Sequence, residues 1–291
     1  MADSSRLAER KVPTRRVSLE DSFGTVPRHF AADGDLVMSH FHAALSALFP
    51  DGEDFFVRSV RHYRDRITEP ELKQAVAGFI GQEAMHGREH RAFNGRLDEL
   101  GYHTKRIERI AKRLLEFREK AVPPIANLAL TAALEHFTAT MAELVMTSEE
   151  ARESFGEEAV RELFVWHALE ESEHKAVAFD VYRAVGGSER LRVLTMKVIR
   201  IGFVLAVVSE MTWTLATDRA TYRPGNLLRS LRRFRQSPVM SPTMWRQLKE
   251  YDRPGFHPDD RDTTALVADW RERLFGSGGS MVAKLAGRPA A

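Results

Sequence analysis

The chain has 291 residues, 43% of them hydrophobic, which is enough to bury the core of one large domain or two small ones. It contains no cysteine, so disulfides, zinc–thiolate sites and cysteine nucleophiles are excluded. The 43 basic and 41 acidic residues nearly balance, and we therefore expect no general affinity for nucleic acid.

The N-terminal region, residues 1–30, is polar and basic, and we expect it to form a flexible arm. It has no apolar stretch of the kind that a secretory signal requires. The pair Arg15–Arg16 is not followed by the hydrophobic segment of a twin-arginine signal. A cytoplasmic location is therefore predicted.

The rest of the chain has the pattern of an all-α protein. Apolar residues recur with the helical period from about residue 33 to 217, and Gly and Pro fall between the periodic runs. We expect a ferritin-like four-helix bundle core with additional helices over residues 31–220, which would hold a di-metal site. Residues 221–291 are expected to form a basic C-terminal extension of short helices and loops.

The first half of the bundle should contain two long helical segments. One is expected near Leu36–Phe49, where Pro50 would end or kink it, and its continuation reaches about Ile67. The pattern Thr68-x-x-Glu71 is typical of a capping box and predicts a second helix that extends to about Leu100.

The second half begins after a more polar helix, Lys105–Lys120. Residues 123–124 are both proline and should open a strongly apolar helix. The segment WHALEESEHKAVAFD, residues 166–180, should lie within one helix that ends at Gly186. The last long helix is expected over Ser188–Thr217.

Two segments could contact partners outside the bundle. The apolar run at residues 201–208 is far shorter than the roughly 20 residues of a membrane span, so it should pack on the bundle or at a homodimer interface. Residues 227–236, LLRSLRRFRQ, combine four arginines with Leu and Phe. This helix could lie peripherally on an anionic membrane, although a solvated helix face gives the same pattern.

The segment at residues 166–180 places ionisable side chains in an otherwise apolar helix. At about 100° per residue, His167, Glu171 and His174 share one face, and Glu170 lies beside them. The spacing Glu171-x-x-His174 is the one that di-iron carboxylate bundles use. A single ExxH motif remains weak evidence, because a charged helix surface can produce it too.

A second ExxH motif strengthens the prediction of a metal site. Glu83-x-x-His86 repeats the spacing, and a carboxylate site of this class also needs one Glu from the helix before each motif. Glu53 and Glu83 lie equally far along the chain from the turn near Thr68. The second pair is Glu135 and Glu171, whose distances from the turn between them differ by only about 3 Å of helical rise.

Single residues of this constellation could also serve purely structural roles. Glu53 could simply favour a helix N-terminus. Glu135 lies among small apolar residues, where a surface role does not fit, and we expect it and Glu171 to bridge two metals. His167 would add a third imidazole, which favours iron over magnesium or calcium. Three residues are expected to support the ligands without binding metal: His90, His136 and Glu170.

The motifs resemble a known family. The segments FPDGEDFF, IGQEAMHGREH, ALEHFTA, WHALEESEHKAVAFDVY and RPGFHP are similar to bacterial proteins labelled predicted metal-dependent hydrolase, over roughly residues 12–260. The ligand order also resembles the ferritin-like di-iron oxygenases of the p-aminobenzoate N-oxygenase type. That resemblance implies seven metal ligands: Glu53, Glu83, His86, Glu135, His167, Glu171 and His174.

Three functions fit these observations. The first is a di-iron enzyme, with Mn or mixed Fe/Mn as variants, that activates O₂ to oxidise a hydrophobic small molecule with electrons from a donor. Apolar residues such as Phe79, Met85, Leu134, Phe137 and Met141 could line its pocket. The second is a hydrolase that uses zinc-activated water, because His86-Gly-Arg-Glu89-His90 fits the HxxEH pattern. The third is a non-catalytic metal-binding or storage bundle.

Overall fold

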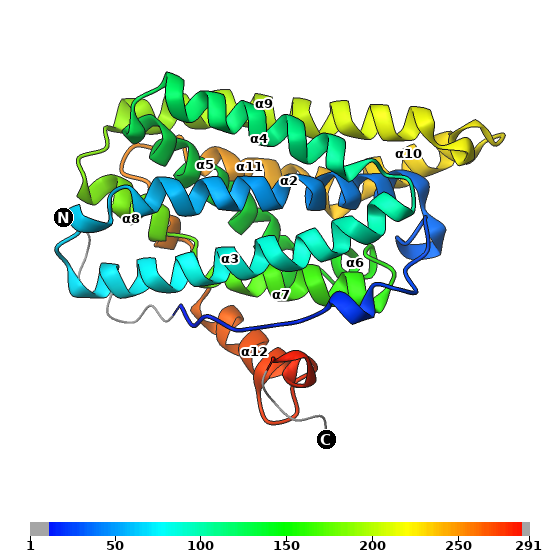
Figure 1. The fold of residues 1–291 in the computed structure, drawn as a ribbon, viewed down its shortest axis with the longest axis horizontal. Helices are drawn as coiled ribbons and strands as arrows, with labels where there is room; N and C mark the ends of the chain where they lie inside the picture. Colours follow the sequence, from blue (N-terminus) through cyan, green and yellow to red (C-terminus); the bar gives the residue numbers. More distant parts are fainter. Residues whose placement is uncertain (1–11, 287–291) are drawn as a thin grey trace.

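The computed structural model describes residues 12–286 and is built from helices (Figure 1). Within this range, β-type pairing is limited to one isolated antiparallel bridge between Val17 and Leu285. The prediction of an all-α bundle is confirmed. The long helices are α2 (Leu36–Arg61), α3 (Pro70–Glu99), α4 (Thr104–Ala121), α5 (Pro124–Thr147), α7 (Glu158–His174) and α9 (Glu189–Thr217). The shorter ones are α6 (Glu149–Glu153), α8 (Val177–Ala184), α10 (Asn226–Gln236), α11 (Pro242–Glu250) and α12 (Thr264–Phe275).

Two helical hairpins form the centre of the bundle. In one, α2 packs against α3, and in the other α5 packs against α7. The helix α4 crosses from the end of α3 to the start of α5 and covers α2, while α9 packs on both α2 and α5 (Figure 1). This arrangement places α2, α3, α5 and α7 around a common interior.

Pro50 lies inside α2, so of the two expected effects, an end or a kink of the first helix, the end is wrong. A proline in a helix has no N–H to bond the carbonyl four residues earlier, which here belongs to Ser46. The side chain of Asn94 on α3 supplies that missing donor, with its Nδ2 at 3.1 Å from the Ser46 oxygen. The helix therefore continues to Arg61 and carries Glu53 into the bundle.

Two other predicted boundaries differ from the structure. The helix α3 begins at Pro70, in the first-turn position that proline favours, and the residue before it makes no side-chain cap. The Thr68 capping box is therefore not formed. The segment 166–180 is not one helix, because α7 ends at His174 and α8 begins at Val177. At the break, Lys175 Nζ donates to the carbonyl of Arg261 at 2.6 Å.

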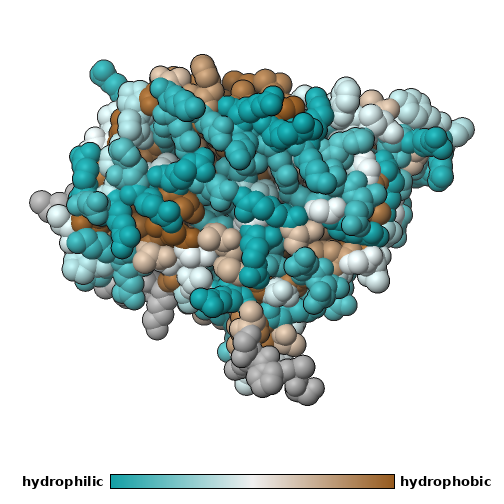
Figure 2. All heavy atoms as spheres, in the orientation of Figure 1, coloured by the Kyte–Doolittle hydropathy of each residue, from teal (hydrophilic) through white to brown (hydrophobic). Residues whose placement is uncertain are grey.

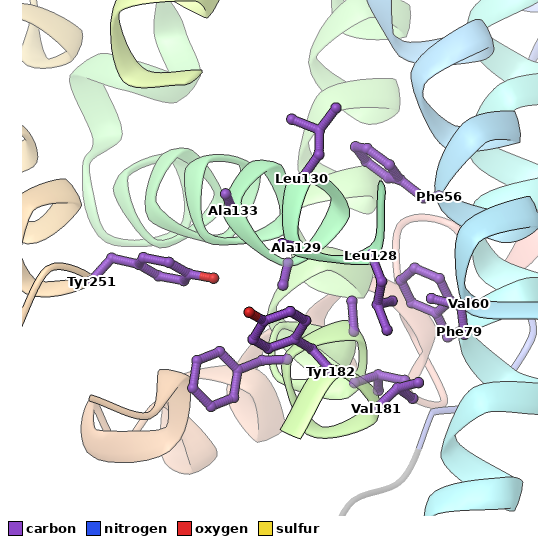
Figure 3. Packing of buried hydrophobic residues seen from close by; sticks show 14 of the residues in the cluster. Phe56, Val60, Phe79, Leu128, Ala129, Leu130, Ala133, Val181, Tyr182 and Tyr251 are labelled. Carbon is purple, nitrogen blue, oxygen red and sulfur yellow. The ribbon is translucent and has the colours of Figure 1, made fainter. Parts of the chain in front are cut away.

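Apolar clusters lie on both sides of the bundle interior. One gathers Phe79 of α3, Leu128 of α5 and Tyr182 of α8, all completely buried (Figure 3). The other includes Phe93 of α3 and Trp166 of α7. Truncating an aromatic side chain in such a core to alanine costs about 3–5 kcal/mol of unfolding free energy. These clusters fix the four central helices relative to one another.

The expectation of a flexible N-terminal arm is wrong for the part that the structure describes. From residue 12 onward the segment runs along α3 and α7 (Figure 1), and Val17 and Leu19 are completely buried. Arg15 reaches the carboxylates of Glu170 and Glu173 on α7. Apolar residues spaced among the basic ones therefore dock this segment on the bundle. Residues 1–11 lie outside the described part of the chain.

The C-terminal region also packs on the bundle. The helix α11 contacts α5, and α12 contacts α7. Trp270 Nε1 of α12 also donates to the carbonyl of Met146 on α5 at 3.0 Å. The basic helix α10 packs on the N-terminal half of α2, and its Ser230 Oγ accepts from the Val37 backbone N–H at 2.7 Å.

The outer face of α9 is apolar and exposed. Leu194, Val198, Ile201 and Leu205 each expose between 60% and 65% of their surface, and hydrophobic residues gather at the edge formed by α4 and α9 (Figure 2). The run 201–208 thus has both exposed and buried side chains, since Val207 is buried. Between residues 12 and 286, no helix combines the length and apolarity needed to cross a membrane.

Candidate metal centre

Seven ionisable side chains from four helices meet inside the bundle, and each is at most 4% exposed. They come from both helical hairpins. The structure therefore brings together every residue that the sequence predicted as a metal ligand. The seven are Glu53 of α2, Glu83 and His86 of α3, Glu135 of α5, and His167, Glu171 and His174 of α7.

The side chains form two adjacent groups, each of which could hold a metal ion. In the first group, His167 Nε2 lies 3.6 Å from Glu53 Oε1, and His86 completes the set. In the second group, His174 Nε2 lies 3.0 Å from Glu83 Oε1. The third member of the second group is Glu171.

Glu171 faces both groups. Its Oε1 lies 2.9 Å from His167 Nε2, and its Oε2 lies 3.5 Å from His174 Nε2. A carboxylate that directs one oxygen toward each of two ligand groups is in the position of a bridging ligand. Glu135 approaches the second group, with Oε2 at 3.4 Å from His174 Nε2, and its expected bridging role stays a prediction.

Many polar atoms of the centre have no hydrogen-bond partner in the described chain. Both oxygens of Glu53, Glu83 and Glu135 are unpaired, as are His86 Nδ1 and His174 Nε2. Buried polar atoms are rarely left unpaired, and buried carboxylates need a cation or a proton to offset their desolvation. Four carboxylates carry the charge that two divalent cations would neutralise. The chemistry of the donor set therefore fits two ions better than one.

The charges of the centre oppose one another without a cation. Burial and the neighbouring carboxylates Glu83 and Glu171 raise the pKa of Glu53 well above its ordinary value. Burial and like charges have the same effect on the pKa of Glu135. Burial also disfavours ionised Glu171, but the two histidines on its helix outweigh this effect and hold its pKa well below the ordinary value.

An outer ring of side chains orients His86. Its Nε2 lies 3.1 Å from Glu170 Oε2, and when Glu170 is ionised its carboxylate can accept this bond but cannot donate it. The proton of a neutral His86 therefore sits on Nε2, which leaves the Nδ1 lone pair directed into the centre. Arg15 binds the other oxygen of Glu170 at 2.9 Å and holds that carboxylate in place.

His174 is oriented in the same manner by an amide. Its Nδ1 lies 2.8 Å from Gln82 Oε1, an oxygen that can only accept, so the proton of a neutral His174 sits on Nδ1. Gln82 Nε2 in turn donates to Glu173 at 2.7 Å. Glu173 is held by Arg15 and Arg271. In that neutral form, the lone pair of His174 Nε2 faces the carboxylates of Glu83 and Glu135.

His167 is fixed by a longer chain of hydrogen bonds. Asn94 donates through its nitrogen, so its oxygen accepts from Ser46 Oγ at 2.7 Å. Ser46 Oγ therefore accepts from His90 Nδ1, and His90 Nε2 accepts from His167 Nδ1 at 2.7 Å. The lone pair of His167 Nε2 then points at Glu171, which is repulsive unless a cation or a second proton lies between them. His90 thus occupies the supporting position predicted for it.

The third residue expected to support the ligands, His136, does not do so. Its side chain points away from the centre, where its Nε2 donates to the carbonyl of Gln247 at 3.2 Å and its ring packs on Tyr251 and Phe256. The supporting roles of Arg15, Gln82 and Glu173 were not predicted. Gln82 could have been found, because it precedes Glu83 as Glu170 precedes Glu171.

The HxxEH pattern does not form a metal site of its own. The Glu89 carboxylate accepts from the backbone N–H of Leu19 at 2.6 Å and pairs with Arg88. Both ring nitrogens of His90 are occupied by Ser46 and His167. Glu89 therefore anchors the N-terminal segment and has no position from which to activate a water at this centre.

A third group of potential ligands lies elsewhere, formed by His29, His40 and Asp218. The guanidinium of Arg28 already pairs with the Asp218 carboxylate at 2.9 Å. Burial lowers the pKa of His40 to about 4, although the Asp218 hydrogen bond opposes this effect. This group joins the N-terminal segment to α2 and the end of α9, and its carboxylate has a cationic partner without a metal.

A cavity of about 80 Å³, which we call the inner chamber, adjoins the first ligand group. His167 and Glu171 form part of its wall, and most other wall residues are apolar. His42 also borders it; burial lowers the pKa of this imidazole to about 3, so the ring is neutral. Of the predicted pocket residues, Met141 lines the inner chamber and Phe79 instead packs against His174.

Fold and site together define a helical-bundle metal-binding protein, with its candidate ligands on four helices. The chain belongs to the family described as predicted metal-dependent hydrolase, whose model matches residues 13–262. This match confirms the resemblance that the sequence motifs indicated, and it spans all seven residues of the centre. Searches of curated proteins and of solved structures gave no match.

Proposed function

We propose that the protein is a dinuclear metal enzyme, with two iron ions, that activates O₂ to oxidise an apolar substrate. One observation carries the proposal: four buried carboxylates and three oriented imidazoles surround two adjacent positions, beside an apolar chamber. Carboxylate bundles of this composition are the known setting for di-iron centres, and imidazole favours iron over magnesium or calcium. A ferritin-like arrangement of the four central helices is part of the proposal.

The residues of this chain would divide the work between the two positions. Glu53, His86 and His167 would hold one ion, Glu83, Glu135 and His174 would hold the other, and Glu171 would join them. When bound, the irons would supply redox chemistry that amino-acid side chains do not have. The protein would orient the ligands through the outer hydrogen bonds, and the apolar wall of the inner chamber would exclude water.

A metal-dependent hydrolase is the second candidate, and the family description favours it. Such an enzyme needs a base close to the metal-bound water. Glu89, the base that the HxxEH pattern suggests, is occupied by Leu19 and Arg88. Hydrolysis would therefore have to use a carboxylate of the same seven-residue centre. The apolar wall of the inner chamber favours oxidation of an apolar molecule over attack on a polar, hydrated bond.

Oxygen uptake separates these candidates. Iron-loaded protein, reduced by dithionite without oxygen and freed of excess reductant, should consume O₂ in proportion to its iron when air is readmitted. The Glu135→Ala protein, which lacks a ligand of the second position, is the matched control and should lose most of this uptake. Uptake by the parent protein no greater than that of the variant would contradict the oxidase proposal. A storage bundle would instead accumulate many irons per chain.

A further inference from the structure

A second apolar cavity lies directly outside the inner chamber. This outer chamber has a volume of about 300 Å³ and lies between α2, α5, α9, α10 and α11. Among the described residues of its wall, Thr212 is the one with a hydroxyl, and none carries a charge. The wall is therefore suited to hydrocarbon and offers almost no hydrogen bonds to a polar solute.

The two chambers share a partition of four side chains. Phe41 and Leu45 of α2, Met141 of α5 and Val239 of the turn Pro238–Met240 border both chambers. Met141 is unbranched and flexible, so it can change rotamer at low cost. A narrow apolar object that displaces these side chains slightly would pass from the outer chamber to the wall formed by Glu171.

The outer chamber opens at the protein surface. Val208 exposes 52% of its surface, and Leu231 and Met240 each expose 40%, while Leu45 of the partition exposes only 6%. The mouth therefore lies beside α10. The exposed rim and the buried end give the chamber a direction, from the surface toward the metal centre.

The helix at the mouth is strongly basic. α10 has the sequence NLLRSLRRFRQ, with four arginines and no acidic residue. Arg235 follows Leu231 by four positions, so the two side chains are neighbours on the helix surface. An anionic group at the mouth would meet a guanidinium there, and arginine binds carboxylates with paired hydrogen bonds.

We propose that the substrate is an unbranched alkyl chain with an anionic head group, such as a fatty-acid-like carboxylate. The head stays at the mouth beside α10, and the chain fills the outer chamber and passes the partition into the inner chamber. A carbon near the far end of the chain then lies beside Glu171 and His167. This inference deepens the proposed function by naming its substrate class, while the binding step itself requires no particular metal.

Calorimetric titration with linear saturated carboxylates from butanoate to hexadecanoate tests the inference on metal-loaded, full-length protein. Each added methylene should tighten binding by about fourfold until the chambers are filled. The alkyltrimethylammonium ion of equal length should bind more weakly than the carboxylate, and Arg235→Gln should reduce that difference. Equal affinity for butanoate and hexadecanoate in the unmodified protein would overturn the proposal whatever the variants do.

Two matched substitutions locate the chain in the molecule. Val239→Trp enlarges the partition, and Val198→Trp adds the same bulk on the exposed face of α9, where Val198 is 63% exposed. Val239→Trp should weaken hexadecanoate at least tenfold, the equivalent of about two lost methylene contacts, and leave hexanoate unchanged. Val198→Trp should alter neither. Equal effects of the two variants on hexadecanoate would overturn the passage through the partition.

The metal content and O₂ uptake of the same preparations separate this inference from the proposed function. Length-dependent binding to protein that holds one zinc and takes up no O₂ would remove the di-iron proposal and leave the channel supported. Two irons and O₂ uptake without any binding of alkyl carboxylates would overturn the channel alone.

Discussion

The two halves of the centre have the same plan but different supports. In α3 the residue before the ExxH glutamate is Gln82, an amide, and it orients His174 of the opposite helix. In α7 the residue before the ExxH glutamate is Glu170, a carboxylate, and it orients His86. Each motif thus supports the histidine of the other, through Nδ1 of His174 and Nε2 of His86.

This difference indicates that the two ligand groups, which would form two metal positions, are not equivalent. An imidazole that donates to a carboxylate is a more basic ligand than one that donates to an amide. The first position has the carboxylate-supported His86 and a second imidazole, His167, next to the inner chamber. The second position has a single imidazole, His174, whose ring packs against Phe79. We expect the first position to be the one closest to substrate.

The largest effect should come from removing the carboxylate common to both positions. Glu171→Ala should leave almost no bound metal, because it takes one ligand from each position at once. Glu135→Ala should cost chiefly the second ion, since its carboxylate approaches His174 alone. Metal analysis after gel filtration checks both. Two ions retained by Glu171→Ala, or identical losses in the two variants, would break the distinction between the positions.

Exchanging the outer supports should sharpen the comparison. Glu170→Gln weakens the support of His86 and leaves Arg15 with one carboxylate fewer, so metal affinity should fall about 10- to 100-fold, mainly at the first position. Gln82→Glu is the reciprocal change and should act on the second position. Competition with a chelator measures each stepwise affinity. If both substitutions change the affinity of the same step, the assignment of supports to positions is wrong.

Metal binding should release protons, and acid should weaken it. The pKa of Glu53 in the first group and of Glu135 in the second is raised, chiefly by burial, so both carboxyl groups hold protons above their ordinary pKa of 4.5. A cation must displace these protons, and affinity therefore increases as the pH rises from that value toward neutrality. Calorimetry in buffers of different ionisation enthalpy should show more than one proton released per chain near pH 6. Proton uptake would contradict the charge assignment.

The smallest effect on the metals should come from Glu89, which lies on α3 but outside both groups. Glu89→Gln keeps the size of the side chain and weakens its bonds to the Leu19 N–H and to Arg88. The cost should be about 1–3 kcal/mol of unfolding free energy, with two metals still bound. Urea denaturation and metal analysis check the two parts. Loss of hydrolytic activity with intact metal and intact stability would favour the HxxEH hydrolase instead.

Local patterns were enough to predict which seven side chains meet inside the bundle. The two ExxH motifs and the two glutamates level with them follow from helical period and turn position, and these features depend on short stretches of sequence. The break after His174 and the continuation of α2 through Pro50 were not predictable in this way. The first coincides with a contact from Lys175 to residue 261, and the second with a donor from Asn94, so both involve residues distant in sequence.

The docked N-terminal segment was missed for a similar reason. Its composition is polar and basic, which predicts an arm, but Arg15 finds two buried carboxylates on α7 that the sequence alone does not place near it. His136 was misplaced because adjacency to Glu135 on a helix says nothing about direction: consecutive residues point about 100° apart. The clustering of the seven side chains was thus predictable from local patterns, whereas their supports depend on tertiary packing.

The central claim is that the seven side chains hold two metal ions together. The most direct measurement is the metal content per chain of protein produced with iron, manganese and zinc all available. We predict two ions per chain, predominantly iron, and a reduced content in the His174→Ala protein. One zinc per chain, or two metals retained by both the Glu135→Ala and His174→Ala proteins, would contradict the account.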